Sequence, residues 1–146
     1  DFLNRDLPGY IDTGLNWVHV RDVVKGHVLA AAKGRIGERY ILGHAEGNLS
    51  MLDALKVLES ISGLPAPKLR VPYSVAWTAA VVSEGIAKLT KKSPKAPLAG
   101  VRMAKYKMWF NPSKAINELG MPQTPVREAF EDAVSWFREN GYVGSN

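Results

Sequence analysis

Apolar positions spaced three to four residues apart predict helices over much of this chain. The first helix is expected from Asp22, an N-cap or first-turn acid, to about Lys33. The second follows Ser50, whose pairing with Asp53 resembles a capping box, and ends at Gly63. Three further helices are expected toward the C-terminus, over about residues 98–107, 111–120 and 125–141.

One more predicted helix, over residues 73–91, is apolar nearly all round. It follows Pro72, which suits the first turn of a helix. A helix of this kind is usually buried in a core or packed on a partner, and core or dimer contact is our preferred interpretation. Docking on a membrane surface is the alternative. Its apolar residues are Val75, Ala76, Trp77, Ala79, Ala80, Val81, Val82, Ile86, Ala87 and Leu89.

Short runs rich in β-branched and aromatic residues predict strands between the helices. They lie at residues 16–20, 39–42 and 68–71, with a further candidate at residues 108–110. Strands alternate with helices in the first half of the chain, and helices dominate the second half. The pattern therefore predicts an α/β fold class, mostly helical with a few short strands.

Composition places the chain among ordinary globular domains. It has 146 residues, of which 46% are apolar and 23% are charged. No cysteine is present, which excludes disulfides, thiolate metal sites and cysteine nucleophiles and fits a reducing, cytoplasmic location. No apolar run is long enough to span a bilayer.

The net charge of +5 is concentrated in residues 88–114, where eight Lys and Arg residues occur without an acid. Such a stretch fits nucleic acid, anionic lipid, a phosphorylated ligand or simply a solvated face. Trp109 and Phe110 beside the lysines would suit single strands, but no nucleic-acid-binding fold is recognisable, so nucleic acid is not expected as a partner. With the helix over residues 73–91, this stretch offers a non-enzymatic binding module as the alternative function, for a membrane surface or a protein.

Motifs that would carry chemistry are missing from the sequence. There is no glycine-rich dinucleotide turn, P-loop or nucleophile elbow. The histidines are His19, His27 and His44, and neither His19 nor His27 has a second ligand at zinc-like spacing, so we expect structural roles for these two. The sequence thus predicts no catalytic, metal-binding or cofactor-binding residue in this chain.

Four segments, in order, resemble the C-terminal part of extended short-chain dehydrogenases/reductases of the epimerase/dehydratase/reductase kind. Residues 17–23 (WVHVRDV) resemble the family's V-H-V-x-D-V segment, and residues 37–43 (GERYILG) the strand that follows it. Residues 111–120 (NPSKAINELG) and the closing helix 126–137 resemble two later segments. The set is most similar to hopanoid-associated sugar epimerases and dihydroflavonol-reductase-like proteins, through residues 12–16 and 102–104.

The resemblance implies a substrate-binding portion without the half that does the chemistry. In the family, an N-terminal Rossmann domain binds NAD(P), and a Tyr-x-x-x-Lys pair moves the proton during hydride transfer. No tyrosine here is followed by lysine at that spacing, so no catalytic residue can be carried over. We expect a piece of a larger enzyme, inactive alone, as a single domain over residues 1–146. Residues 1–45 would contribute a late strand and a helix to the Rossmann sheet, and residues 46–146 a mostly helical cap.

The same resemblance suggests substrate-side residues. Nucleotide-sugar epimerases often have an arginine two residues before the aromatic of the V-H-V segment, where Leu15 stands here, so a nucleotide-sugar is less favoured than the family alone implies. Asn16 could line the substrate cleft, and Arg102 could bind a phosphate or carboxylate. The expected partners are a small molecule (a sugar, nucleotide-sugar or flavonoid-like compound) and the Rossmann half. A second copy of the chain could instead cover the surface left bare.

Overall fold

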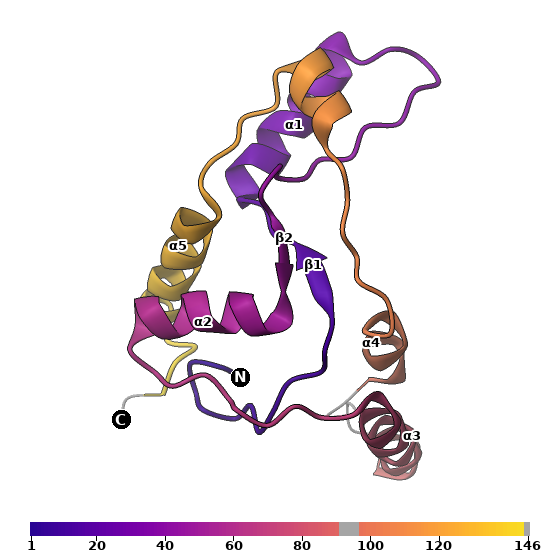
Figure 1. Ribbon diagram of the computed structural model, residues 1–146, viewed down its shortest axis with the longest axis vertical. Helices are drawn as coiled ribbons and strands as arrows, with labels where there is room; N and C mark the ends of the chain where they lie inside the picture. The colour runs from indigo at the N-terminus through magenta and orange to yellow at the C-terminus, as the bar shows by residue number, and fades with distance from the viewer. Residues whose placement is uncertain (91–96, 145–146) are drawn as a thin grey trace.

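The computed structural model describes residues 1–90 and 97–144 and is built mainly from helices (Figure 1). The prediction of a mostly helical α/β piece with a few short strands is confirmed. The elements are β1 (Gly14–Asn16), α1 (Val20–Lys33), β2 (Asn48–Ser50), α2 (Met51–Ser62), α3 (Tyr73–Thr90), α4 (Leu98–Met103), the π-helical turn η1 (Ala115–Leu119) and α5 (Val126–Glu139).

Side-chain caps fix where two of the helices begin. At α2, the Ser50 hydroxyl accepts a hydrogen bond from the Asp53 amide at 3.1 Å, so the N-cap half of the predicted capping box is present, and it donates to the Asp53 carboxylate at 2.6 Å. Gly63 ends this helix in the left-handed conformation, with φ of 74°. Helix α1 begins before Asp22, because the Nδ1 atom of His19 accepts from the Arg21 amide and makes His19 the N-cap.

The strands form a small antiparallel pair. Residue Leu15 of β1 faces Leu49 of β2, and Leu15 also bridges Met108 in the parallel direction. The predicted strand over residues 16–20 is therefore wrong in its bounds. Its pairing ends at Asn16, because the chain turns into the capped start of α1 three residues later.

Two other predicted strands do not form. Residues 39–42 form no ladder with any described residue, and residues 68–71 make a single bridge, from Arg70 to Tyr10. A segment becomes a strand only when a neighbour supplies the ladder hydrogen bonds. These two strand predictions are therefore wrong within the described part of the chain, apart from the bridge at Arg70.

Two small apolar clusters hold the helices together. In the first, Ala115, Leu119 and Met121 pack with residues of α1 and with Tyr40 and Leu42. In the second, α2 lies against α5, and each helix contributes two buried apolar residues, which are Ala54, Leu55, Phe130 and Val134. Neither cluster includes α3.

Helices α3 and α4 form an arm beside the rest of the molecule (Figure 1). Only Ala80 of α3 is buried, and large apolar side chains such as Val82, Ile86 and Leu89 are exposed. The interpretation of this helix as part of a core is therefore wrong within the described chain. Lys91, with which the prediction ended this helix, and Lys92 and Lys95 of the basic stretch lie outside the described residues.

The surface is large for the size of the chain. The accessible area is 9866 Å², whereas a compact monomer of this mass exposes roughly 7400 Å². Among the described residues, no helix combines the length and apolar character needed to cross a membrane.

Candidate functional site

The V-H-V-R-D-V segment links the start of α1 to α5 and to the turn that precedes α5. The Asp22 carboxylate is buried and accepts two hydrogen bonds from Thr124, from the backbone amide at 2.6 Å and from the hydroxyl at 3.0 Å. The Nε2 atom of His19 lies 3.1 Å from the Asp132 carboxylate of α5. Because its Nδ1 atom accepts the cap hydrogen bond, Nε2 carries the proton and donates to Asp132. These polar residues therefore join segments over 100 positions apart.

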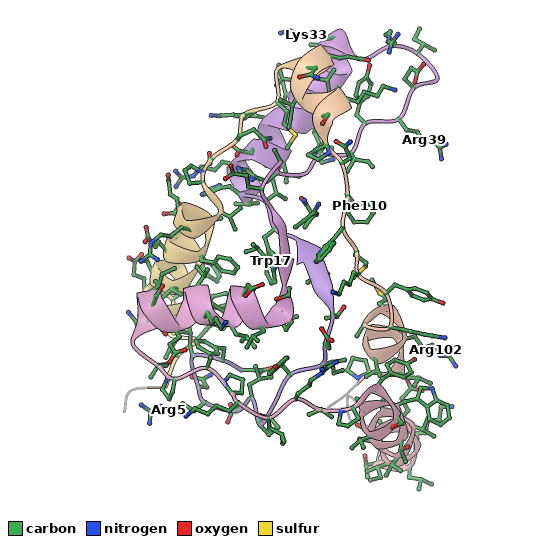
Figure 2. All side chains as sticks on the ribbon, in the orientation of Figure 1. Arg5, Trp17, Lys33, Arg39, Arg102 and Phe110 are labelled. Carbon is green, nitrogen blue, oxygen red and sulfur yellow. The ribbon has the colours of Figure 1, made fainter. Side chains whose placement is uncertain are left out.

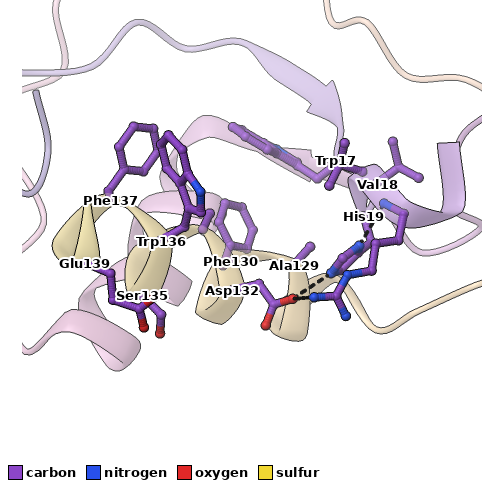
Figure 3. Close-up of a pocket in the computed structure, with 13 residues that line it drawn as sticks. Trp17, Val18, His19, Ala129, Phe130, Asp132, Ser135, Trp136, Phe137 and Glu139 are labelled. Atoms are coloured by element: carbon purple, nitrogen blue, oxygen red, sulfur yellow. Dashed lines mark hydrogen bonds and ion pairs between the residues drawn. The ribbon is translucent and has the colours of Figure 1, made fainter. Parts of the chain in front are cut away.

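A cleft of about 680 Å³ opens where this segment meets α5 (Figure 3). Its apolar wall includes Trp17 and Phe130, whose ring centroids are 5.0 Å apart, and Trp136 lies farther along α5. The polar edge is the group formed by His19, Asp132 and the Arg21 guanidinium, which lies 3.4 Å from the same carboxylate. A cleft of this size and lining can hold the apolar part of a small molecule.

The indole N–H of Trp17 is the unusual polar group of this cleft. It is buried, and no described residue provides a hydrogen-bond acceptor for it. A buried donor without a partner costs free energy, so such groups normally meet a water molecule, a ligand or another chain. A hydrogen-bond acceptor placed beside the indole N–H of Trp17 would therefore stabilise the fold.

Asn16 lies at the end of β1 and organises the loop that precedes β2. Its side-chain nitrogen donates to the His44 carbonyl at 2.9 Å and to the Asn48 side-chain oxygen at 2.8 Å. Its side-chain oxygen accepts from the His44 amide at 2.9 Å. Asn48 in turn bonds both backbone groups of Phe110, at 3.0 and 3.1 Å. The amide of Asn16 thus positions the loop and, through Asn48, the segment that carries Phe110.

Arg102 lies on α4 with its side chain exposed, well away from Trp17 in the view of Figure 2. It forms no ion pair with any described carboxylate, and it makes no described contact with Asn16. Lys105 and Lys107, which follow it, lie over the rings of Tyr106 and Trp109 at 5.8 and 4.8 Å from the centroids. The structure therefore leaves the two sequence-predicted substrate residues apart.

Two family-like segments, GERYILG and NPSKAINELG, meet in a charged cluster on the surface. The Tyr40 hydroxyl donates to Glu118 at 2.9 Å, and the Arg35 guanidinium donates to the same carboxylate at 2.7 Å. Lys114 pairs with Glu38 and lies over the Tyr40 ring, 4.7 Å from its centroid. These contacts fasten residues 35–40 to η1 and hold the segment 39–42 in place.

The cluster shifts the ionisation of its members. The pKa of Glu118 is lowered, first by the Tyr40 hydroxyl bond and then by Arg35, against the opposing effect of desolvation. The Lys114 ammonium lowers the pKa of Glu38, and the bond to Tyr40 and the Glu118 charge raise the pKa of Arg35. All three groups are therefore held in their charged forms around Tyr40.

The histidines take part in local hydrogen bonds. His19 caps α1, His27 donates from Nδ1 to the Val23 carbonyl at 2.8 Å, and His44 is buried and accepts from the Glu46 amide at 3.1 Å. Within residues 1–90 and 97–144, no group of three or more His, Asp or Glu residues lies close enough to hold a metal ion. His19 thus caps α1 and contacts α5, His27 bonds the backbone of its own helix, and His44 stabilises a turn.

Three residues of this arrangement escaped the sequence reasoning. Asn48 carried no signal beyond its place shortly before the capping Ser50. Thr124 was recognised as the start of a helix, but nothing in the sequence paired it with Asp22, 102 positions away. Glu118 belongs to a family-like segment, and its pairing with Tyr40 could have been found only from covariation between homologues.

No family model matches the chain, but individual proteins do. The chain is 45% identical over 146 residues to a protein of Synechocystis sp. named "Putative dihydroflavonol 4-reductase", and 29% identical over 145 residues to sterol demethylase protein B of Methylococcus capsulatus. The matches cover 97% and 98% of this chain but 42% and 44% of the relatives. The chain therefore spans less than half the length of these relatives.

Solved structures share the fold. The structure of gox2253 matches with a TM-score of 0.74 and 38% identity over 99% of this chain and 43% of its own length. The structure of PA4631, a nucleoside-diphosphate-sugar epimerase from Pseudomonas aeruginosa, matches with a TM-score of 0.73 and 27% identity over 98% and 41%. UDP-glucuronic acid 4-epimerase from Bacillus cereus, solved with NAD, matches at 20% identity and a TM-score of 0.59, which supports the fold alone.

Proposed function

Since the chain has the sequence and fold of the C-terminal part of an extended short-chain dehydrogenase/reductase, we propose that it is the substrate-binding portion of an NAD(P)-dependent enzyme. The parent would be an epimerase/dehydratase or a dihydroflavonol-reductase-like oxidoreductase. The observation that carries the proposal is the match along nearly the whole chain to less than half of each relative. In this proposal, residues 1–45 join the Rossmann sheet and residues 46–146 form the cap over the substrate.

The surface of the chain supports a missing partner half. Residues 39–42 alternate between exposed and partly buried side chains, are held at Tyr40 by Glu118 and Lys114, and have no strand partner among the described residues. On α1, Val20, Val24 and Val28 recur every fourth residue and are all exposed. A strand-like segment without a partner and an apolar helix stripe together fit a sheet and its covering layer on another polypeptide.

The chemistry of the substrate side is set by few residues. Leu15 occupies the position where an arginine would hold a diphosphate, and it pairs with Leu49, so no cation stands there. Arg102 is the cation we propose for an anionic group of the substrate, and Asn16 lines the substrate side and sets the shape of the loop beneath it. The lack of a cation at position 15 favours a sugar or flavonoid-like compound as the substrate. A nucleotide-sugar held through Arg102 is the alternative substrate.

The chain itself offers no place for a nicotinamide cofactor in this proposal. A dinucleotide site needs a glycine-rich turn from a parallel strand into a helix, so that backbone amides reach the pyrophosphate. Helix α2 follows β2 directly through Ser50, whose hydroxyl already accepts the Asp53 amide, and β1 and β2 are antiparallel. The residues present do not fit NAD(P), and we assign that site, with the catalytic tyrosine and lysine, to the N-terminal half.

Two measurements test this function. The 146-residue chain is titrated with NADPH and NADH while the fluorescence of its four tryptophans is followed, and no saturable change is expected. The chain is then co-expressed with the N-terminal half of the Synechocystis relative, and NAD(P)H consumption is assayed with sugar and flavonoid-like substrates. Cofactor binding by the chain alone, or failure of this and other matched halves to give cofactor-dependent turnover, would contradict the proposal.

A further inference from the structure

The cleft between the V-H-V-R-D-V segment and α5 is not lined by either residue that we propose for the substrate. Neither Asn16 nor Arg102 contributes to its wall. The wall comes instead from the start of α1 and from one side of α5, where Trp17, Phe130 and Trp136 lie (Figure 3). The volume of the cleft would suit a small molecule, but the proposed substrate contacts leave it without an occupant.

Apolar surface continues from this cleft along α1. Val20, at the edge of the cleft, begins the exposed stripe that Val24 and Val28 extend on the same face of the helix. Val24 and Val28 also line a second groove of about 430 Å³, which Leu29 and Pro122 complete. The cleft and the groove are therefore two depressions in one apolar surface.

This continuity favours a polypeptide as the occupant of the cleft. A small molecule would fill the cleft but leave the stripe on α1 in water. The chain also exposes roughly 2500 Å² more than a compact monomer of its mass, an excess that a small ligand does not cover. More than half of each matched relative lies outside the region that this chain spans, so such proteins contain a polypeptide of sufficient size.

We propose that the cleft beside Trp17 is the docking pocket for the N-terminal Rossmann half, which inserts apolar side chains between α1 and α5. The inference rests on the function proposed above and specifies which surface of the chain the partner half covers. The exposed Arg21 guanidinium and Ser135 hydroxyl at the cleft are hydrogen-bond donors, so the docking segment should carry acceptors beside its apolar side chains. The buried indole N–H of Trp17, which lacks an acceptor among the described residues, belongs to the same wall.

The absence of cysteine makes the chain suitable for labelling at single introduced cysteines. Ala133 is exposed on α5 and lines the cleft, whereas Glu128 is exposed on the same helix and does not line it. The variants Ala133→Cys and Glu128→Cys are each labelled with the polarity-sensitive dye acrylodan, and the N-terminal half of the Synechocystis relative is added. The emission at position 133 should shift to shorter wavelength, because docking removes that label from water, and the emission at position 128 should not change.

A second pair of variants tests the same pocket without a label. Ala133→Lys places a long cation in the cleft, so it should weaken association of the two halves at least about tenfold, because the charge would be buried without a partner. Glu128→Lys is the matched control on α5 and should leave the affinity within about twofold. Both positions are exposed, so both variants should fold, and circular dichroism of the chain alone checks this.

Failure of this inference can be told apart from failure of the proposed function. Halves that associate and show cofactor-dependent turnover, while Ala133→Lys assembles normally and the label at position 133 stays in water, would rule out the docking pocket alone. A chain that assembles with no matched half would contradict both proposals. A shift of the label at position 133 on adding dihydroquercetin or UDP-glucose without the partner, or on raising the concentration of the chain alone, would instead assign the cleft to a small molecule or to a second copy.

Discussion

At the scale of single residues, two buried polar side chains connect the two ends of this chain. His19 and Asp22 are close neighbours in sequence, and both are buried. One bonds the middle of α5 and the other bonds the turn that precedes it. The V-H-V-R-D-V segment, which resembles a family motif in sequence, therefore has a direct structural role: it fastens the last helix to the first.

Replacing Asp22→Ala should lower the free energy of unfolding by about 2–3 kcal/mol, because two hydrogen bonds to a buried carboxylate are lost and the Thr124 amide is left unsatisfied. Asp22→Asn is the graded control. Its oxygen still accepts from the Thr124 amide and its nitrogen can donate to the hydroxyl, so it should cost less. Urea unfolding followed by circular dichroism measures both, and equal losses for the two variants would contradict the hydrogen-bond account.

Replacing Gly47→Ala should disrupt the loop that Asn16 organises. A Cβ atom there would lie 2.2 Å from the Trp17 carbonyl oxygen, a backbone atom that cannot move aside. We expect a loss of more than about 2 kcal/mol, the size of a strongly overpacked site. Gly85→Ala on α3 is the control, because it meets open space and should stabilise the helix by about 0.5–1 kcal/mol. Thermal unfolding that ranks the two variants the other way would refute this assignment.

At the scale of elements, the charged cluster around Tyr40 shows how one segment is held in place without a neighbouring strand. Tyr40 and Leu42 pack toward η1 and α1, while Arg39 and Ile41 point to solvent. The alternation is that of a strand with one face covered. Side chains of a distant segment thus substitute for part of the order that a sheet neighbour would impose.

Lowering the pH should destabilise the contacts of Glu38 and Glu118 that hold residues 35–42. The folded-state pKa values of Glu38 and Glu118 are lowered, so their contribution to stability is complete above the ordinary glutamate value of about 4.3 and is lost as the pH falls through the lowered values. Amide chemical shifts of residues 35–42, followed by NMR in that acid range, should move together with the Glu118 titration. In the Glu118→Gln variant, the part of the chemical-shift change that is due to Glu118 should disappear. Shifts that stay independent of Glu118 would show that the cluster does not hold the segment.

The elements also show what local sequence can predict. The spacing of apolar residues and the caps located α2, α3 and α5 to within a few residues, because helices are stabilised by contacts three to four positions apart. The strands predicted at residues 39–42 and 68–71 do not form ladders, because strand pairing is not encoded locally. Within the described chain the first segment has no strand partner and the second bridges only Tyr10, so a local sequence that favours a strand does not produce one.

The stripe on α1 gives a prediction that depends on the proposed function. Val24→Lys places a charge on a side chain that is 58% exposed, so the chain's own stability should change by less than about 0.5 kcal/mol. Association with the Rossmann half should be abolished, because the lysine would be buried there without a partner. Lys33→Gln, at the exposed end of the same helix, is the control. Size-exclusion chromatography of the co-expressed halves measures this, and normal assembly of Val24→Lys would place the partner elsewhere.

At the scale of the whole molecule, only part of the candidate site can be predicted from the sequence, because the rest depends on contacts between distant segments. Asn16 could be singled out from sequence because it precedes the V-H-V segment, yet its bonds to His44 and Asn48 depend on chain reversal over 28 and 32 residues. The cleft beside Trp17 forms only when α5 returns to the start of α1. Asn16 and Arg102 do not line this cleft, and the shape of the cleft depends on contacts that no local pattern specifies.

The exposed area predicts how the isolated chain behaves. It exceeds the value for a compact monomer of its mass by roughly 2500 Å², more than the roughly 800 Å² that one partner buries in a standard protein–protein interface. The chain alone should therefore bind the dye ANS and self-associate as its concentration rises, because exposed apolar surface favours both. If the chain is the C-terminal portion proposed above, addition of the proposed N-terminal half should suppress ANS fluorescence and raise the unfolding temperature through binding linkage. A chain that remains monomeric, ignores ANS and gains no stability from any Rossmann half would show that its apolar surface is tolerated in water and that the missing-half account is wrong.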